Sequence, residues 1–262
     1  MTRLPVVPNR ELGQHFLVDE NILGVIGRLA GLDRRDVVLE VGPGLGILTR
    51  YLADRVRRVH AVELDRALEP HLAVALEGRR NVDLLFGDAV RLDLAALEPR
   101  PTKLVANLPY NVATPIVVES LDRLASIERW CVMVQREVAD RFVAAPGTKA
   151  YGAVSVLVRL VTDRTGFHPV ARTVFRPPPN VDSALVALRR RGPLAERYPA
   201  VKRLVEAAFA HRRKTLPNSL ELAGHTDRRR AAAALEALGF SPATRAERLA
   251  PDDFAALAEL LS

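Results

Sequence analysis

The stretch Val37–Gly46, VVLEVGPGLG, joins a run of apolar residues to a loop that contains three glycines. Val37 to Val41 predict a buried β-strand, and Ile47 to Ala53 after the loop predict a helix. A strand, a glycine loop and a helix in this order form a nucleotide-binding unit, because glycines allow close backbone approach and a helix N-terminus favours an anionic group. The stretch therefore predicts an open α/β sheet. Its G-P-G-L-G spacing differs from the G-x-G-x-x-G of dinucleotide binders.

Each of the next three predicted strands ends in a polar side chain. The strands cover residues 59–63, 82–86 and 103–106, and the side chains belong to Glu63, Asp88 and Asn107. An acid at the end of the second strand can hold ribose hydroxyls, and a carboxylate can accept a hydrogen bond from an adenine amine. Because the carboxyl ends of parallel strands line one crevice, the three side chains predict one adenosine-binding site. Taken singly, Glu63 or Asp88 would be read as a helix cap or a solvated loop acid.

A stiff polar loop, Asn107-Leu108-Pro109-Tyr110, follows the strand at residues 103–106. Pro109 fixes its own φ and keeps Leu108 out of the helical region. The Asn107 side chain and the Leu108 carbonyl then offer two acceptors beside the ring of Tyr110. Two acceptors and a ring face suit a planar base that carries an exocyclic NH2. The alternative is an ordinary Asn-Pro turn leading into a helix.

The kinds of predicted secondary structure change near residue 191. Before it, we expect further helices over 21–30, 115–124 and 138–144 and strands over 130–134, 151–161 and 184–189. After it, we expect only helices, over 199–210, 227–238 and 251–261. The sequence thus predicts a domain over residues 1–190 and a small all-helical domain over residues 191–262.

Composition limits the class of protein. The 262 residues are 48% hydrophobic and 26% charged, as in a globular protein. The net charge is +7, and the residues from Arg189 onward contain 14 Lys and Arg against 9 Asp and Glu. The basic excess therefore lies in the last quarter of the chain and suggests a polyanionic partner. With one cysteine, Cys131, no metal-ligand cluster, no signal sequence and no membrane span, we expect a cytoplasmic protein without a structural metal.

Taken together, the motifs resemble those of the ribosomal small-subunit RNA adenine dimethyltransferase family. They run in order along nearly the whole chain as GQHFLVDENIL, EVGPGLGILT, VELD, GDA, NLPYN, YGAVSV, FRPPPNVDSA and AFAHRRKTLPNSL. The resemblance implies a class I, Rossmann-like fold that binds S-adenosyl-L-methionine. It also implies that the enzyme adds two methyl groups to the N6 amine of each of two adjacent adenosines near the 3′ end of small-subunit rRNA.

The resemblance assigns roles to individual residues. The cofactor would contact a set spread over five motifs, comprising His15, Leu17, Gly42, Gly44, Gly46, Glu63, Leu64, Asp88, Ala89 and Asn107. His15 stands where many members have Asn, and Ala113 where many have Ser or Thr. The target base would be handled by Asn107, Leu108, Pro109, Tyr110 and Phe175, with Tyr110 and Phe175 stacking on it after it leaves its helix.

The basic cluster Arg212-Arg213-Lys214 follows the predicted helix at residues 199–210. We expect these side chains to contact rRNA phosphates in immature small subunits, with the protein acting as a monomer. Two other interpretations remain: the cations interact with the dipole at the C-terminal end of the helix, or Arg212 pairs with an acid of the catalytic domain.

Three other functions compete with the first. A large-subunit rRNA methyltransferase that confers antibiotic resistance shares the cofactor motifs, but usually has Ile where Leu108 stands. An assembly factor would act mainly by binding immature subunits. A dinucleotide oxidoreductase is disfavoured because this sequence lacks the G-x-G-x-x-G spacing and because that function leaves both proline loops unexplained.

Overall fold

The structure is a computed structural model that describes residues 4–9, 12–193 and 196–262. The chain divides into two compact units, the first made of residues 1–139 and 163–190 and the second of residues 140–162 and 191–262. The division after residue 190 lies where the sequence predicts that strands end and that only helices follow. Residues 140–162, expected in the first domain, instead belong to the second unit.

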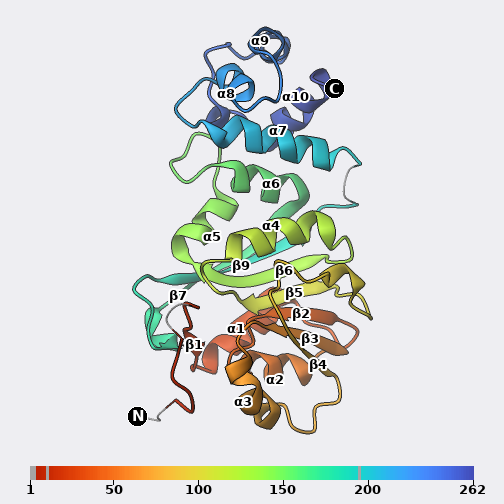
Figure 1. Cartoon of the computed structure of the whole chain (residues 1–262), viewed down its shortest axis with the longest axis vertical. Helices are drawn as coiled ribbons and strands as arrows, with labels where there is room; N and C mark the ends of the chain where they lie inside the picture. The colour runs from red at the N-terminus through yellow and green to blue at the C-terminus, as the bar shows by residue number, and fades with distance from the viewer. Residues whose placement is uncertain (1–3, 10–11, 194–195) are drawn as a thin grey trace. The chain divides into compact units, whose positions relative to one another are not determined.

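The first unit is built on a seven-stranded sheet with the order β4-β3-β2-β5-β6-β9-β7 (Figure 1). Its strands are β2 (Val37–Val41), β3 (Arg58–Glu63), β4 (Val82–Phe86), β5 (Lys103–Asn107), β6 (Arg129–Gln135), β7 (Thr162–Val170) and β9 (Ser183–Arg190). Strands β2 to β6 pair in parallel, and β9 runs antiparallel to β6. The strand order reverses between β2 and β5, which is where open α/β sheets bind ligands.

Helices cover this sheet on both faces. They are α1 (Asn21–Ala30), α2 (Ile47–Ala53), α3 (Glu69–Ala75) and α4 (Ala113–Arg123), and α5 (Arg136–Val143) crosses from the first unit into the second. Val38 and Val105 pack with the apolar faces of α1 and α2 in one core. Their neighbours Leu39 and Leu104 point the other way, toward a small apolar pocket that Ile116 of α4 helps to close. This alternation follows from the two-residue period of a strand.

A second, two-stranded sheet joins distant parts of the first unit. Strand β1 (Phe16–Leu17) pairs antiparallel with β8 (Phe175–Arg176), and the Val18 amide continues the ladder to the Val174 carbonyl. The sequence predicted neither strand, because two residues are too few to show a period. The pairing ties the N-terminal segment to the proline loop.

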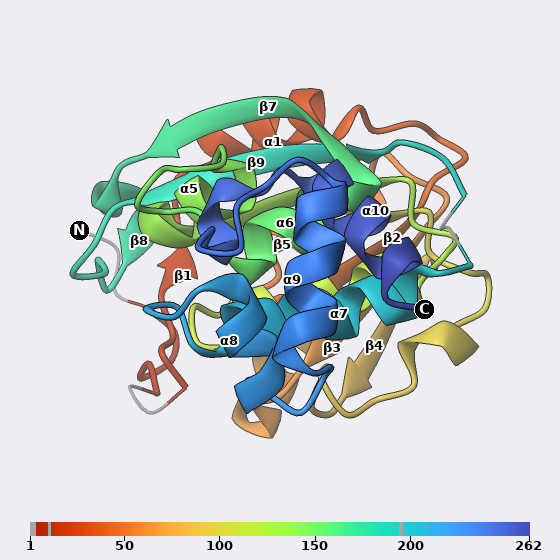
Figure 2. The ribbon, with the colours of Figure 1, turned by 90° about the horizontal axis from the view of Figure 1, so that it is seen from above.

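The second unit is helical, with α6 (Ala153–Val161), α7 (Tyr198–Ala210), α8 (Leu216–Leu222), α9 (Arg228–Ala237) and α10 (Pro251–Leu260) (Figure 2). The prediction of a strand over residues 151–161 was wrong, because helix α6 occupies most of this range. The Ser155 hydroxyl accepts a hydrogen bond from the Gly152 amide and starts a helix there. Helix α6 contacts α7 and α10, and a short Val-rich run fits a buried helix as well as a strand.

Short 3₁₀ turns in the described residues cover 66–68, 94–96, 172–174 and 246–248. Among all residues that the structure describes, no helix is both long enough and apolar enough to cross a membrane.

Candidate active site

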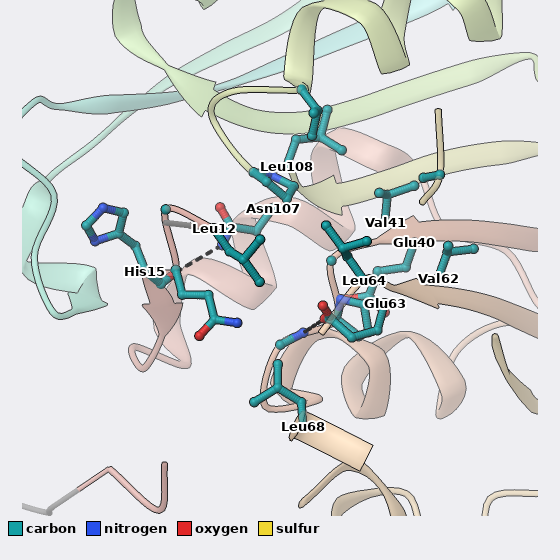
Figure 3. A pocket seen from close by; sticks show the side chains of 18 of the residues that line it. Leu12, His15, Glu40, Val41, Val62, Glu63, Leu64, Leu68, Asn107 and Leu108 are labelled. Atoms are coloured by element: carbon teal, nitrogen blue, oxygen red, sulfur yellow. Dashed lines mark hydrogen bonds between the residues drawn. The ribbon is translucent and has the colours of Figure 1, made fainter. Parts of the chain in front are cut away.

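A pocket in the first unit opens at the carboxyl ends of β2, β3 and β5, where the strand order reverses (Figure 3). Glu40, Glu63 and Leu64 come to it from β2 and the end of β3, and Asn107 and Leu108 from the end of β5. Of the predicted cofactor residues, the pocket is lined by His15, Leu17, Gly42, Gly44, Glu63, Leu64, Asp88, Ala89 and Asn107. The fold thus brings together residues that lie up to 92 positions apart in the chain.

The glycine loop fits closely between two neighbouring segments. Gly42 has a φ of 76°, and a Cβ atom there would lie 3.2 Å from the Pro109 ring. Gly44 has a φ of 58°, and a Cβ atom would lie 3.1 Å from the Phe16 ring. Side chains would therefore be both strained and crowded here. Gly46, with a φ of 77°, does not line the pocket; it begins α2 and packs against Leu72.

Glu63 is buried and tied to the backbone around it. Its Oε2 accepts a hydrogen bond from the Gly44 amide at 3.1 Å, and its Oε1 accepts one from the Asp65 amide at 2.9 Å. Burial raises the pKa of Glu63, and these backbone amides oppose the rise. Glu63 therefore holds the glycine loop in place at the pocket wall.

Asp88 and Leu64 form a polar and an apolar part of the same wall. Asp88 Oδ1 accepts from the Val90 amide at 2.9 Å, and its Oδ2 lies 3.3 Å from Arg91 Nε. The acid therefore caps its own turn, as an ordinary loop acid does, while also lining the pocket. Leu64 is 54% exposed and lines the same pocket. Such a side chain can pack on a flat ring.

The loop Asn107–Tyr110 is held by bonds to β6 and to the N-terminal segment. The Leu108 amide donates to the Met133 carbonyl at 3.0 Å, so the loop continues the β5–β6 pairing by one residue. Asn107 Nδ2 donates to the His15 carbonyl at 3.5 Å, drawn as a dashed line in Figure 3. Leu108, Pro109 and Tyr110 also line the pocket, with the Leu108 side chain buried.

Phe175 is placed differently from its prediction. It is 3% exposed, belongs to the core cluster that includes Leu17, and does not line the pocket. In the β1–β8 pair, Phe175 stands opposite Leu17, and burial of its ring anchors the proline loop. The structure thus gives the ring a place in the core beside the site, and its predicted stacking on the base stays a prediction.

Two polar residues that line the pocket, Glu40 and Gln14, were missed by reasoning from the sequence. Glu40 lines the pocket from β2, is 1% exposed, and its Oε2 has no hydrogen-bond partner among the described residues. Burial raises the pKa of Glu40 to about 8, against the opposing effect of the nearby Thr49 hydroxyl and with a smaller contribution from the Glu63 charge. An acid inside the apolar run Val37–Val41 was the available signal. Gln14 Nε2 donates to Asp65 Oδ2 at 2.7 Å and fastens the N-terminal segment over the pocket.

The basic cluster Arg212-Arg213-Lys214 follows α7 in the second unit, and its members differ in their contacts. Arg212 donates from its guanidinium to the Tyr151 carbonyl at 3.0 Å, which links the chain after α7 to the segment before α6. Arg213 and Lys214 are exposed, and in the described part of the chain neither side chain has an acidic partner. The described partner of Arg212 is thus a main-chain carbonyl of its own unit.

The sheet order, the glycine loop and the pocket at the switch point define a class I, S-adenosyl-L-methionine-dependent methyltransferase. The family model described as ribosomal RNA adenine dimethylase matches residues 8–262, and the chain belongs to this family. No group of three or more His, Cys, Asp or Glu side chains in the described residues is arranged to hold a metal ion.

Similar proteins agree with this assignment. The chain is 49% identical to the ribosomal RNA small subunit methyltransferase A of Rubrobacter xylanophilus, over 97% of this chain and 95% of that one. It is 45% identical to the protein of the same name from Thermobifida fusca, over 98% and 91%. Among solved structures, the 23S rRNA methyltransferase ErmE matches with a TM-score of 0.69 at 32% identity, over 94% of this chain and 99% of that chain. A dimethyladenosine transferase from Plasmodium falciparum shares the fold, with a TM-score of 0.76, 24% identity and coverage of 93% and 96%.

Proposed function

We propose that this protein transfers methyl groups from S-adenosyl-L-methionine to the N6 amines of two adjacent adenosines near the 3′ end of small-subunit rRNA. The product is N6,N6-dimethyladenosine, formed during ribosome biogenesis. The observation that carries the proposal is the loop Asn107–Tyr110, which brings two acceptors and an aromatic ring to the pocket. Relatives named as small-subunit methyltransferases, 42–49% identical, support the choice of rRNA.

The residues around the pocket suit the cofactor. The crowded turns at Gly42 and Gly44 let the backbone approach it, and exposed Leu64 beside Asp88 suits an adenine ring and its amine. Glu63, which lines the pocket at the end of β3, suits the ribose hydroxyls of the cofactor. When bound, the cofactor supplies an electrophilic methyl group on a sulfonium sulfur.

The protein's part in the reaction is to position and polarise the target amine. The N6 lone pair of adenine is delocalised into the ring and is a poor nucleophile. If Asn107 Oδ1 and the Leu108 carbonyl accept both N–H bonds, the nitrogen becomes more pyramidal and its lone pair is freed. Pro109 keeps the two acceptors in fixed positions, and Tyr110 stacks on the base. The gain comes from orientation and electrostatics, with no strong general base.

The helical unit would dock the protein on RNA. Arg213 and Lys214 are exposed and free of acidic partners in the described structure, which suits phosphate contacts. Arg212 would contribute by fixing the segment that carries them, through its bond to Tyr151. We propose that the partner is the immature small subunit, in the cytoplasm, and that the enzyme acts as a monomer.

Two alternatives differ in what they predict. A large-subunit methyltransferase has a structural relative in ErmE, but the relatives named for the small subunit are more similar in sequence. An assembly factor would bind immature subunits equally well with the cofactor site disabled. Primer extension on small-subunit rRNA, after incubation with protein and methyl donor, tests the proposal: stops at two adjacent adenosines support it, and an unmodified 3′ region refutes it.

A further inference from the structure

The hydroxyl of Tyr110 lies 2.6 Å from the hydroxyl of Ser183, at hydrogen-bond distance. Tyr110 ends the pocket loop, whereas Ser183 begins β9 and is 1% exposed. The bond therefore connects the pocket to a strand 73 positions further along the chain. Ser183 does not itself line the pocket.

Ser183 stands on a rigid support. It pairs with Gln135 at the end of β6, and the Asp182 carbonyl before it accepts from the Arg136 amide at 2.9 Å. A buried hydroxyl needs a hydrogen-bond partner, and in the described structure the Tyr110 hydroxyl is the partner of the Ser183 side chain. The tip of the Tyr110 ring is thus fixed to the central sheet.

The side of the same ring faces the N-terminal segment. The ring centroids of His15 and Tyr110 are 5.8 Å apart at an angle of 30°, and His15 Nδ1 lies 2.8 Å from the Pro177 carbonyl. Because a carbonyl only accepts, Nδ1 donates. Burial raises the pKa of Tyr110, against the opposing effect of the Ser183 bond, so its hydroxyl stays protonated and can keep that bond.

We propose that Ser183 is a positioning residue for the methyl-accepting base: it fixes the orientation of the Tyr110 ring on which the base stacks. This rests on the proposed function, in which Tyr110 stacks on the target adenine. An untethered tyrosine turns about its side-chain bonds, and only a fraction of its orientations align a base with the two acceptors of the loop. Fixing the ring before the base arrives reduces the entropy lost on alignment.

The experiment compares Ser183→Ala, Tyr110→Phe and the double variant with the wild-type chain. Ser126→Ala is the matched control, because its hydroxyl also donates one bond, to the Pro101 carbonyl at 2.8 Å, away from the pocket. For each protein we would measure kcat, the KM for the RNA, and cofactor affinity by calorimetry. We expect either single substitution to lower kcat roughly two- to tenfold, the effect of one hydrogen bond. The affinity of each variant for the cofactor should stay within about twofold of the wild-type value, a small difference in binding free energy. The kcat of the double variant should be no lower than that of either single variant.

Wild-type kcat in Ser183→Ala or in Tyr110→Phe would overturn the proposal, and so would losses that multiply in the double variant. If Ser183→Ala does not fold, Tyr110→Phe removes the same bond from the pocket side and decides alone. A wild-type chain that leaves small-subunit rRNA unmodified would instead refute the proposed function, before any variant is compared.

Discussion

The side-chain amide nitrogen of Asn107 donates a hydrogen bond to the main-chain carbonyl of His15. Because that carbonyl only accepts, the NH2 group of Asn107 must face it, and the Oδ1 atom is left to accept a bond from an incoming amine. The N-terminal segment therefore orients the side chain on which the proposed chemistry depends.

We expect Asn107→Ala to lower methyl transfer about 100- to 1,000-fold, the usual effect of removing one group that stabilises the transition state. RNA affinity should change little, because the geometry of the amine changes only in the transition state. Single-turnover transfer of a labelled methyl group measures the rate. A variant that keeps more than about a tenth of the wild-type rate, far above the range expected for such a group, would refute this role for Asn107.

Glu63→Gln and Asp88→Asn should each weaken cofactor binding by about 1 to 3 kcal/mol, since each removes a charged acceptor from the pocket wall. Glu69→Gln is the control, because Glu69 is exposed and its ion pair in the described structure is with the neighbouring Arg66. Isothermal titration calorimetry measures the three affinities. Wild-type affinity in both pocket variants would mean that the cofactor binds elsewhere.

Glu40 should make folding stability depend on pH. Its folded-state pKa of about 8 exceeds the ordinary 4.5, so the folded chain binds more protons between these values and stability falls as pH rises through them. One such group contributes a slope of about 1.4 kcal/mol per pH unit. Urea unfolding at several pH values should show this slope in the wild-type chain and its loss in Glu40→Gln. Equal pH dependence of stability in the wild-type chain and in Glu40→Gln would mean that the Glu40 carboxyl is solvated in the folded chain and not buried.

Phe175→Ala should lower the free energy of unfolding by about 3 to 5 kcal/mol, because a buried ring is removed from the core. Phe175→Leu keeps most of the apolar volume and should cost less. Denaturant unfolding measures both, and methyl transfer is assayed at a temperature where each variant is folded. Full stability of Phe175→Ala together with loss of methyl transfer would contradict this structural role and support the predicted stacking on the base.

Replacing Arg213 and Lys214 by Ala should weaken binding to immature small subunits. It should also reduce the slope of affinity against salt by about one unit per lost phosphate contact. Arg34→Ala with Arg80→Ala removes the same charge from exposed positions of the first unit and serves as control. Filter binding over several salt concentrations gives both slopes. Equal salt slopes for the wild-type chain and the Arg213/Lys214 variant would mean that these residues do not contact RNA phosphates.

The sequence by itself determined the parallel strands β2 to β6 and the polar side chains that end three of them at the pocket. Val37–Gly46 predicted a strand, a glycine loop and a helix, and each appears as β2, the loop and α2. Glu63, Asp88 and Asn107 were predicted to share one crevice because each ends a parallel strand, and all three line the pocket. These inferences depend on local periodicity and on a general property of parallel sheets, so a single sequence contains them.

Tertiary contacts decided what local pattern could not. The run at residues 151–161 became helix α6 because its apolar face packs against α7 and α10. Phe175 turned into the core because Leu17 stands opposite it in the β1–β8 pair, and Ser183 reached Tyr110 because β9 starts at the edge where β6 ends. Each partner lies tens to more than a hundred residues away, and such contacts leave no periodic trace in the chain.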